Sequence, residues 1–214
     1  MSSSQDEDVA AVLDCLRSGW LTMGPRIKAF EEALADWTGA THAVTVSNGD
    51  AALFLALMAV DVKAGDEVYA CTDTGRRAVE RCGAHAATEP TDRTRAAICT
   101  FGEPSRDTTG EGVAIIEDAT ESNEATPMLT GTAAAFSFAE GRPLGIGEGG
   151  MVITNDDAVA ARVRALRAHA MTSGTWDRHR GHSDSYDIVD VGYNFRMDEP
   201  RAALGLARLA RLRG

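Results

Sequence analysis

The chain has 214 residues, and its 32 Asp plus Glu against 21 Lys plus Arg give a formal net charge of −11 at pH 7. This length predicts one domain with its own core, and the acidic excess excludes nucleic acid and anionic membranes as general partners because both would be repelled. The longest apolar run, residues 51–60, is far shorter than the roughly 20 residues that span a bilayer. The polar, acidic N-terminus does not resemble a signal peptide. We therefore expect a cytoplasmic protein.

Hydrophobic periodicity predicts alternating helices and strands along the chain. Starting from the N-terminus, the pattern predicts helices at 6–17 and 25–39, a strand at 42–47, a helix within 48–60, a strand at 66–71, a short helix at 76–83, strands at 95–101, 112–118, 134–138 and 150–155, and helices at 157–170 and 198–212. Pro25 and Gly39 suit the start and the end of the second helix. Residues 172–187 are polar and rich in turn formers.

Alternation of this kind, with several strands almost wholly apolar, predicts an α/β fold with three α/β/α layers and a mostly parallel central sheet. We expect a single domain over 1–214. It comprises an N-terminal helix and arm (1–24), an α/β core (25–170), a polar loop (171–197) and a terminal helix (198–214). Ligands of such folds gather at the carboxyl ends of the strands. Polar groups fall there at 48–50, 117–118 and 137–142.

Cysteine and histidine spacing argues against a metal site. Four cysteines form no CxxC pair and show no metal-ligand spacing: Cys15, Cys71, Cys82 and Cys99. His179 and His182 lie near two aspartates in a polar loop, but they have no third ligand of matching context. We expect no metal, and we expect these two histidines to face a substrate or an interface.

Several long motifs carry a family resemblance over nearly the whole chain. They include "SGWLTMGPRIKAFEEALADWTGATHAVTVSNGDAALFLAL", "GDEV", "IIEDATES", "GEGGMVITND" and "VGYNFRMDEP", all in the same order. Together they resemble the DegT/StrS-type sugar aminotransferases of fold type I, which use pyridoxal phosphate (PLP) to make amino sugars. The resemblance implies the large domain of that fold, a missing C-terminal small domain, and additional family chain between "CGAHAATEP" and "TDRTRAAI".

The resemblance also implies where a PLP site would lie. It maps the cofactor-binding positions, here vestigial, onto Asn48, Gly49, Asp50, Asp118, Glu121, Ser137 and Asn194. Asp118 matches the aspartate that pairs with the pyridinium nitrogen, and Asn194 matches a residue that reaches the phosphate from the partner subunit. Asp50 replaces the threonine of the phosphate turn and would repel a phosphate there. The substrate side would include Trp20, His179, His182, Tyr193 and Arg196.

Arg142 stands where the family has its Schiff-base lysine. A lysine amine can lose its proton and attack an aldehyde, whereas a guanidinium stays protonated and forms no Schiff base. The sequence contains only two lysines, Lys28 and Lys63, and neither falls near the expected site. The resemblance therefore predicts a protein that has lost lysine-dependent transamination.

The remaining ionisable residues suggest acid–base chemistry without a cofactor. Carboxylates that lie close together separate their pKa values, and an adjacent arginine can hold an anionic substrate. We expect Glu140 or Asp118 to act as base and Arg142 to clamp the anion, with Asp50 as a further catalytic candidate. A dehydratase, lyase, isomerase or cyclase in sugar or natural-product biosynthesis fits this set. Arg142 paired with Asp50 or Asp118 in a filled, inactive site is the structural alternative.

Two other functions stay open at this point. One is a non-catalytic pseudo-aminotransferase that completes the site of an active homologue. The other is a DegT-type aminotransferase or dehydratase that still binds PLP or its amine form, PMP. We expect no cofactor, a small-molecule substrate, and a homodimer or a heteromer with a related aminotransferase-like chain, since the family shares its active site across a dimer.

Overall fold

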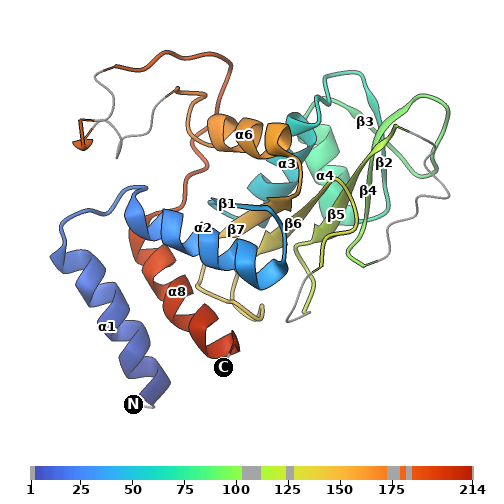
Figure 1. Ribbon diagram of the computed structural model, residues 1–214. Coiled ribbons are helices and arrows are strands. Elements are labelled where there is room, and N and C mark those ends of the chain that lie inside the picture. The colour runs from blue at the N-terminus through green and yellow to red at the C-terminus, as the bar shows by residue number, and fades with distance from the viewer. Residues whose placement is uncertain (1–2, 103–111, 124–127, 173–178, 182–184, 214) are drawn as a thin grey trace.

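The computed structural model describes residues 3–102, 112–123, 128–172, 179–181 and 185–213, and its centre is a seven-stranded sheet (Figure 1). The strand order is β1-β7-β6-β5-β4-β2-β3. All neighbouring strands pair in parallel except β7, which is antiparallel to both β6 and β1. The strands are β1 (His42–Val46), β2 (Glu67–Ala70), β3 (His85–Ala87), β4 (Thr94–Thr100), β5 (Ala114–Ala119), β6 (Ala133–Ser137) and β7 (Gly150–Thr154). The predicted mostly parallel sheet is confirmed.

Helices cover both faces of this sheet. One face carries α3 (Gly49–Ala59), α4 (Asp73–Arg81) and α6 (Asp157–Leu166), and the other carries α2 (Pro25–Thr38) and α8 (Glu199–Arg213). Helix α1 (Ser3–Arg17) packs against α8 at one end of the molecule. The predicted three-layer architecture is therefore confirmed.

The central position of α3 explains its composition. Its sequence, "GDAALFLALMA", is apolar around most of its circumference, and all residues from Ala51 to Leu57 are buried. A helix that is apolar on all sides is typical of one enclosed by its neighbours, and α3 contacts the sheet, α4 and α6. Its N-terminus, immediately after β1, is thereby fixed at the carboxyl edge of the sheet.

Three predicted helices have clearly different boundaries in the structure, and a short strand was not predicted. Helix α1 begins at Ser3, not residue 6. Helix α4 begins at Asp73, not residue 76, because the Thr72 hydroxyl caps it by accepting from the Gly75 amide at 3.0 Å. Helix α6 ends at Leu166, not residue 170, because His169 and Ala170 adopt positive φ angles of 62° and 52°, which a right-handed helix excludes. Strand β3 has only three residues and no alternating pattern.

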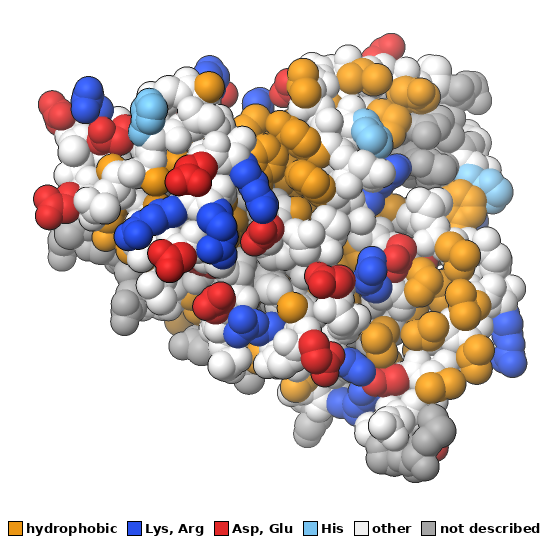
Figure 2. Space-filling model, turned by 180° about the vertical axis from the view of Figure 1, so that it is seen from behind, with side chains coloured by type: hydrophobic (Ala, Val, Ile, Leu, Met, Phe, Trp, Pro, Cys, Tyr) orange, Lys and Arg blue, Asp and Glu red, His pale blue; other side chains and the backbone are white. Residues whose placement is uncertain are grey.

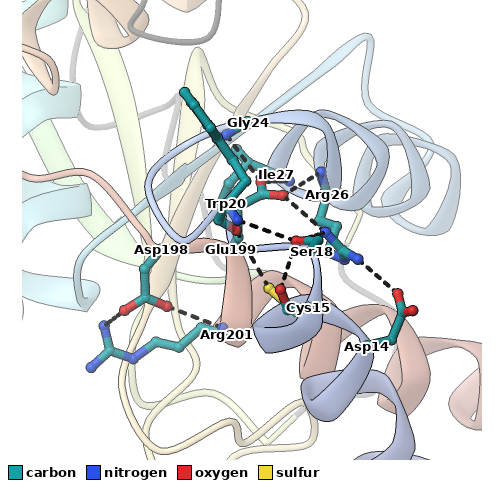
Figure 3. A network of polar contacts seen from close by, with 10 residues as sticks. All are labelled: Asp14, Cys15, Ser18, Trp20, Gly24, Arg26, Ile27, Asp198, Glu199 and Arg201. Atoms are coloured by element: carbon teal, nitrogen blue, oxygen red, sulfur yellow. Dashed lines mark hydrogen bonds and ion pairs between the residues drawn. The ribbon is translucent and has the colours of Figure 1, made fainter.

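A buried carboxylate joins the two helices on the second face. Glu199, at the start of α8, has no exposed surface and accepts hydrogen bonds from the amides of Gly24, Arg26 and Ile27 at 3.0, 3.0 and 2.8 Å (Figure 3). The first amides of a helix have no partner within the helix. Glu199 therefore caps α2 from 172 to 175 residues away in sequence.

Exposed hydrophobic side chains gather at the end of the molecule that carries α1 and α8, at the lower right of Figure 2. They include Val9, Leu13, Leu16 and Leu212. Among the described residues, no helix combines the length and apolar character needed to cross a membrane.

Candidate functional site

A cleft opens at the carboxyl ends of β4, β5 and β6, as the parallel sheet predicts. Two cavities of about 620 and 360 Å³ make up this cleft. They share Thr74, Arg77 and Glu121 in their walls, so they form one continuous depression. The larger cavity extends toward Phe101 and Asp118, and the smaller one toward the N-terminus of α3.

The N-terminus of α3 forms one wall of the cleft. Asn48 caps this helix by accepting the Ala51 amide on its side-chain oxygen at 2.8 Å. Gly49 packs so closely that an added Cβ would lie 2.9 Å from the Cβ of Ser137 and 3.1 Å from Thr120. The structure thus brings together Asn48, Gly49 and Ser137, three positions predicted from sequence, at a helix N-terminus suited to an anion.

Asp118 lies at the end of β5, is only 7% exposed, and has both carboxylate oxygens occupied by the chain itself. Oδ2 accepts the Thr72 hydroxyl at 2.5 Å and the Thr74 hydroxyl in a shorter contact. Oδ1 accepts the Thr120 amide at 3.1 Å and its hydroxyl at 2.6 Å. Sequence reasoning missed these threonines, although "CTDT" directly after β2 places two hydroxyls at the carboxyl edge of the sheet.

Asp50 does not pair with Arg142, contrary to the structural alternative raised by the sequence. Its carboxylate lies 2.9 Å from Arg81 on α4, and both side chains are about half exposed. Arg77, one turn earlier on α4, lines the cleft and has no hydrogen bond or ion pair within the described residues. The α4 guanidinium groups therefore lie close enough to offset part of the negative charge of Asp50, a contribution that the sequence analysis did not include.

Arg142 itself reaches across the smaller cavity. Its Nη1 donates to the backbone carbonyl of Glu121 at 2.8 Å, and it pairs with neither Asp50 nor Asp118. The Glu121 and Glu148 side chains line the same cavity. Glu140, favoured from sequence as a base, is exposed and lines neither part of the cleft.

Neither lysine of the sequence lines the cleft, and both belong to the described residues. Lys28 lies on α2, where its ammonium is 3.9 Å from Glu32. Lys63 follows α3 and lies 3.0 Å from Asp61. Both side chains are largely exposed. This chain therefore presents guanidinium groups to the cleft and no amine.

The 193–196 segment contributes two residues to the neighbourhood of the cleft. Tyr193 stacks on Phe195, and both rings line a cavity of about 270 Å³ beside the N-terminus of α3, together with Asn48 and Asp50. Asn194 is exposed, accepts the Arg196 Nε–H at 3.0 Å and does not line the cleft, and neither does Arg196.

The remaining predicted substrate-side residues lie elsewhere. Trp20 packs over Gly24 near the start of α2 (Figure 3). Its ring centroid is 4.6 Å from that of His179. Neither residue lines the cleft of this chain. His182 lies outside the described residues. Within the described part of the chain, no group of three His, Cys, Asp or Glu residues is arranged to hold a metal ion.

Comparison with known proteins identifies the family. The sequence pattern described as the DegT/DnrJ/EryC1/StrS aminotransferase family matches residues 2–87 and 105–214. The chain is 33% identical over 242 aligned positions to the spore coat polysaccharide biosynthesis protein SpsC of Bacillus subtilis, covering 96% of this chain and 62% of that protein. It is 34% identical to the GDP-perosamine synthase of Caulobacter vibrioides, covering 94% of this chain and 61% of that protein.

A solved structure gives the same result. The fold matches the S. venezuelae protein DesV, whose crystal structure contains a ketimine intermediate, with a TM-score of 0.81 and 31% sequence identity. The match covers 98% of this chain and 62% of DesV. This chain thus spans about three fifths of the length of these relatives. By sequence pattern, identity and fold, the chain belongs to the DegT/DnrJ/EryC1/StrS aminotransferase family.

Proposed function

We propose that this chain has lost lysine-dependent transamination and that its cleft performs acid–base chemistry on a small anionic molecule without a cofactor. The observation that carries the proposal is that no lysine of the chain lines the cleft, whose basic groups are Arg77 and Arg142. A guanidinium stays protonated and cannot form the covalent link to PLP that a lysine amine provides. The same groups can instead bind a carboxylate or phosphate by charge-assisted hydrogen bonds.

The surroundings of Asp118 also do not fit PLP. In the family resemblance this carboxylate pairs with the pyridinium nitrogen. Here Oδ2 already accepts two hydroxyls, from Thr72 and Thr74, and Oδ1 accepts two bonds from Thr120. A cofactor nitrogen would have to displace at least one of these donors. The residues of this chain therefore favour a cleft that is no longer built around PLP.

The proposed chemistry assigns roles by position in the cleft. Arg77 and Arg142 hold the anionic group of the substrate, since both line the smaller cavity. Glu121 lines both cavities and is exposed, so its carboxylate is available as the base, with Asp118 as the other candidate. Glu140 is less suited because it lies outside the cleft. Sugar-derived molecules are the first substrates to screen, because the relatives named above are sugar-pathway proteins.

A cofactor titration tests the first half of this proposal. PLP and PMP are added separately to the purified chain and followed by absorbance and by calorimetry. We expect no saturable binding below about 1 mM of either cofactor. Binding tighter than about 10 µM, near −7 kcal/mol, contradicts the proposal and revives a PLP- or PMP-dependent function.

A set of variants tests the second half once a screen of anionic sugars has identified a turnover. Glu121→Gln and Asp118→Asn should each lower kcat by about 10²-fold or more if the residue acts as the base. Glu140→Gln is the matched control, because it removes a carboxylate from a loop residue outside the cleft. Unchanged kcat in both cleft variants would overturn the acid–base assignment.

A second function is favoured by the 186–191 segment, which exposes Tyr186, Ile188, Val189 and Val191. Contiguous exposed hydrophobic side chains mark association surfaces more often than free surface. On this alternative the chain acts as a subunit that places Asn194 and Arg196 at the site of a homologue. Co-expression with a full-length relative and light scattering test it. A complex that Val189→Asp disrupts supports this alternative, and separate monomers contradict it.

A further inference from the structure

A second polar cavity, of about 460 Å³, lies at the free edge of β1 and shares no lining residue with the cleft. β1 is the outer strand of the sheet, and α2 and α6 flank it on opposite faces (Figure 1). The charged residues in the wall come from α2 and from the end of α6: Lys28, Glu31, Glu32, Arg164 and Arg167. His42, also in the wall, is paired with Asp157 at 2.7 Å.

Arg167 is the buried centre of this cavity wall, with a side chain that is only 6% exposed. Its Nη1 donates to the Thr45 carbonyl at 2.6 Å and to Glu31 in a shorter contact. The Thr45 amide in turn donates to Glu31 at 2.9 Å. The outward-facing amide and carbonyl of Thr45 are not paired by any neighbouring strand, and Glu31 and Arg167 supply their hydrogen-bond partners instead. This structural role uses only Nη1 of the Arg167 guanidinium.

The other edge of the same guanidinium has no partner. Nε is buried and makes no hydrogen bond, and no hydrogen bond to a described residue involves Nη2. Buried polar groups are almost always hydrogen-bonded, so an unused buried donor calls for an explanation. The Nε–H and one Nη2–H point in parallel, which is the fork that receives the two oxygens of a carboxylate or phosphate.

The charges around this fork favour an anion. Arg164 is half-buried and makes no hydrogen bond or ion pair with the described residues. Lys28 is exposed, and its ammonium is 3.9 Å from Glu32, a loose contact. Three cations, Lys28, Arg164 and Arg167, thus face two carboxylates, Glu31 and Glu32, which leaves an excess of one positive charge in the wall.

From this geometry we infer a second binding site for a small oxyanion, a carboxylate or a phosphate, at the β1 edge. The Nε–Nη2 edge of Arg167 and the guanidinium of Arg164 hold the oxyanion, with Lys28 at the rim. Because Nε is closed to solvent, binding requires a shift of the guanidinium that brings this edge to the cavity.

The test uses the ¹⁵N-labelled chain, titrated separately with inorganic phosphate and with acetate at constant ionic strength. Backbone amides of Thr45 and Arg167 and the Arg167 Nε–H signal report on the β1 edge. Amides of Gly49 and Asp50 report on the cleft. We expect saturable shifts at the β1 edge, on the order of millimolar affinity, and the comparison of phosphate with acetate shows which oxyanion fits.

Two variants localise the effect without breaking the buried pair. Arg164→Gln should weaken the titration at the β1 edge by about tenfold, as the loss of one charge-assisted hydrogen bond produces. Arg77→Gln, a cleft arginine that is equally free of partners, is the matched control and should leave the β1-edge shifts unchanged.

The inference is overturned by either of two results. One is the absence of saturable shifts at the β1 edge up to about 50 mM of both anions, a range that includes very weak binding. The other is a titration that Arg77→Gln abolishes and Arg164→Gln leaves intact, because the anion would then occupy the cleft alone. Both results leave the proposed cleft chemistry standing, so the two ideas fail separately.

Discussion

Two guanidinium–carboxylate pairs in this molecule have the same chemistry and opposite surroundings. Glu31 and Arg167, beside β1, have side chains that are 12% and 6% exposed. Asp50 and Arg81, at the mouth of the cleft, are 46% and 53% exposed. The first pair also bonds to the backbone of Thr45, whereas the second makes no other side-chain hydrogen bond or ion pair with the described residues.

The difference in exposure predicts that the Glu31–Arg167 pair stabilises the fold and that the Asp50–Arg81 pair can take part in ligand binding. A buried pair is costly to break because a charge left without its partner stays out of water. An exposed pair contributes little, since water and salt can replace either partner. Asp50 and Arg81 are therefore free to exchange partners when an anion enters the cleft, while Glu31 and Arg167 hold the sheet edge.

The largest expected effect comes from breaking the buried pair. Arg167→Met should lower the free energy of unfolding by about 3–5 kcal/mol, because Glu31 loses its cation in a site that is nearly closed to solvent. Urea denaturation measures this value. The control is Arg162→Met, in helix α6, which ends directly before Arg167. The Arg162 side chain is 40% exposed, and its loss should cost less than about 1 kcal/mol. Equal losses in the two variants would refute the buried role.

A second buried carboxylate should give the next largest effect. Glu199→Gln replaces one acceptor oxygen by an NH₂ group, which then faces either the amides of Gly24 and Ile27, the donors to Oε1, or the amide of Arg26, the donor to Oε2. We expect a loss of about 1.5–3 kcal/mol in urea denaturation, the range for hydrogen bonds to a charged group. Asp198→Asn is the matched control, because this neighbour is 44% exposed and pairs with Arg201 within its own helix turn. A loss no larger than that of the control would show that the cap contributes little.

Much of the fold could be predicted from sequence because it depends on patterns that are local. Apolar runs such as "GVAIIED" mark buried parallel strands, and Pro25 marks the start of α2. The predicted helix boundaries that were wrong depend on a side-chain cap and on backbone conformation, which hydrophobic patterns do not report. Thr72 caps α4 four residues before the predicted start, and positive φ angles at His169 and Ala170 end α6 early.

The candidate site was harder to predict because its contacts join distant segments. The sequence placed Asn48, Asp118 and Ser137 at the carboxyl edge of the sheet, and the structure brings them to one cleft. It did not indicate that Asp118 would accept hydroxyls from 44 and 46 residues earlier in the chain. No local pattern distinguishes Glu121, which lines the cleft, from Glu140, which does not.

A pH-dependent effect of intermediate size involves the contact between α1 and α8. Burial disfavours the charged form of Asp8, but hydrogen bonds from Arg211 and Arg208 outweigh it and lower the pKa of this carboxyl below 3.8. A lowered folded-state pKa contributes stability above the unfolded value, and this stability is lost as the pH falls through the folded value. The stability contributed by Asp8 should therefore decline below about pH 4.

Urea midpoints of the wild type and Asp8→Asn, measured at about pH 6 and about pH 3, check this expectation. The difference between the two proteins should be larger at the higher pH. Asp73→Asn, whose carboxylate is 86% exposed and 3.5 Å from Arg76, should show little difference at either pH. A difference for Asp8→Asn that stays constant with pH would exclude the two arginines as its cause.

The smallest expected effect on stability comes from breaking the exposed Asp50–Arg81 pair. In contrast to Arg167→Met, a change in this pair should alter anion binding in the cleft more than it alters stability. Arg81→Gln should change the free energy of unfolding by less than about 1 kcal/mol, because Asp50 is hydrated with or without its partner. The same variant leaves the Asp50 charge unbalanced at the N-terminus of α3, so phosphate titrations followed at the Gly49 amide should weaken. Asp50→Asn removes that charge and should strengthen them. If Arg81→Gln destabilised the chain as much as Arg167→Met, exposure would not explain the different contributions of the two ion pairs to stability. The inference that Asp50 can exchange Arg81 for another partner in the cleft would then be wrong as well.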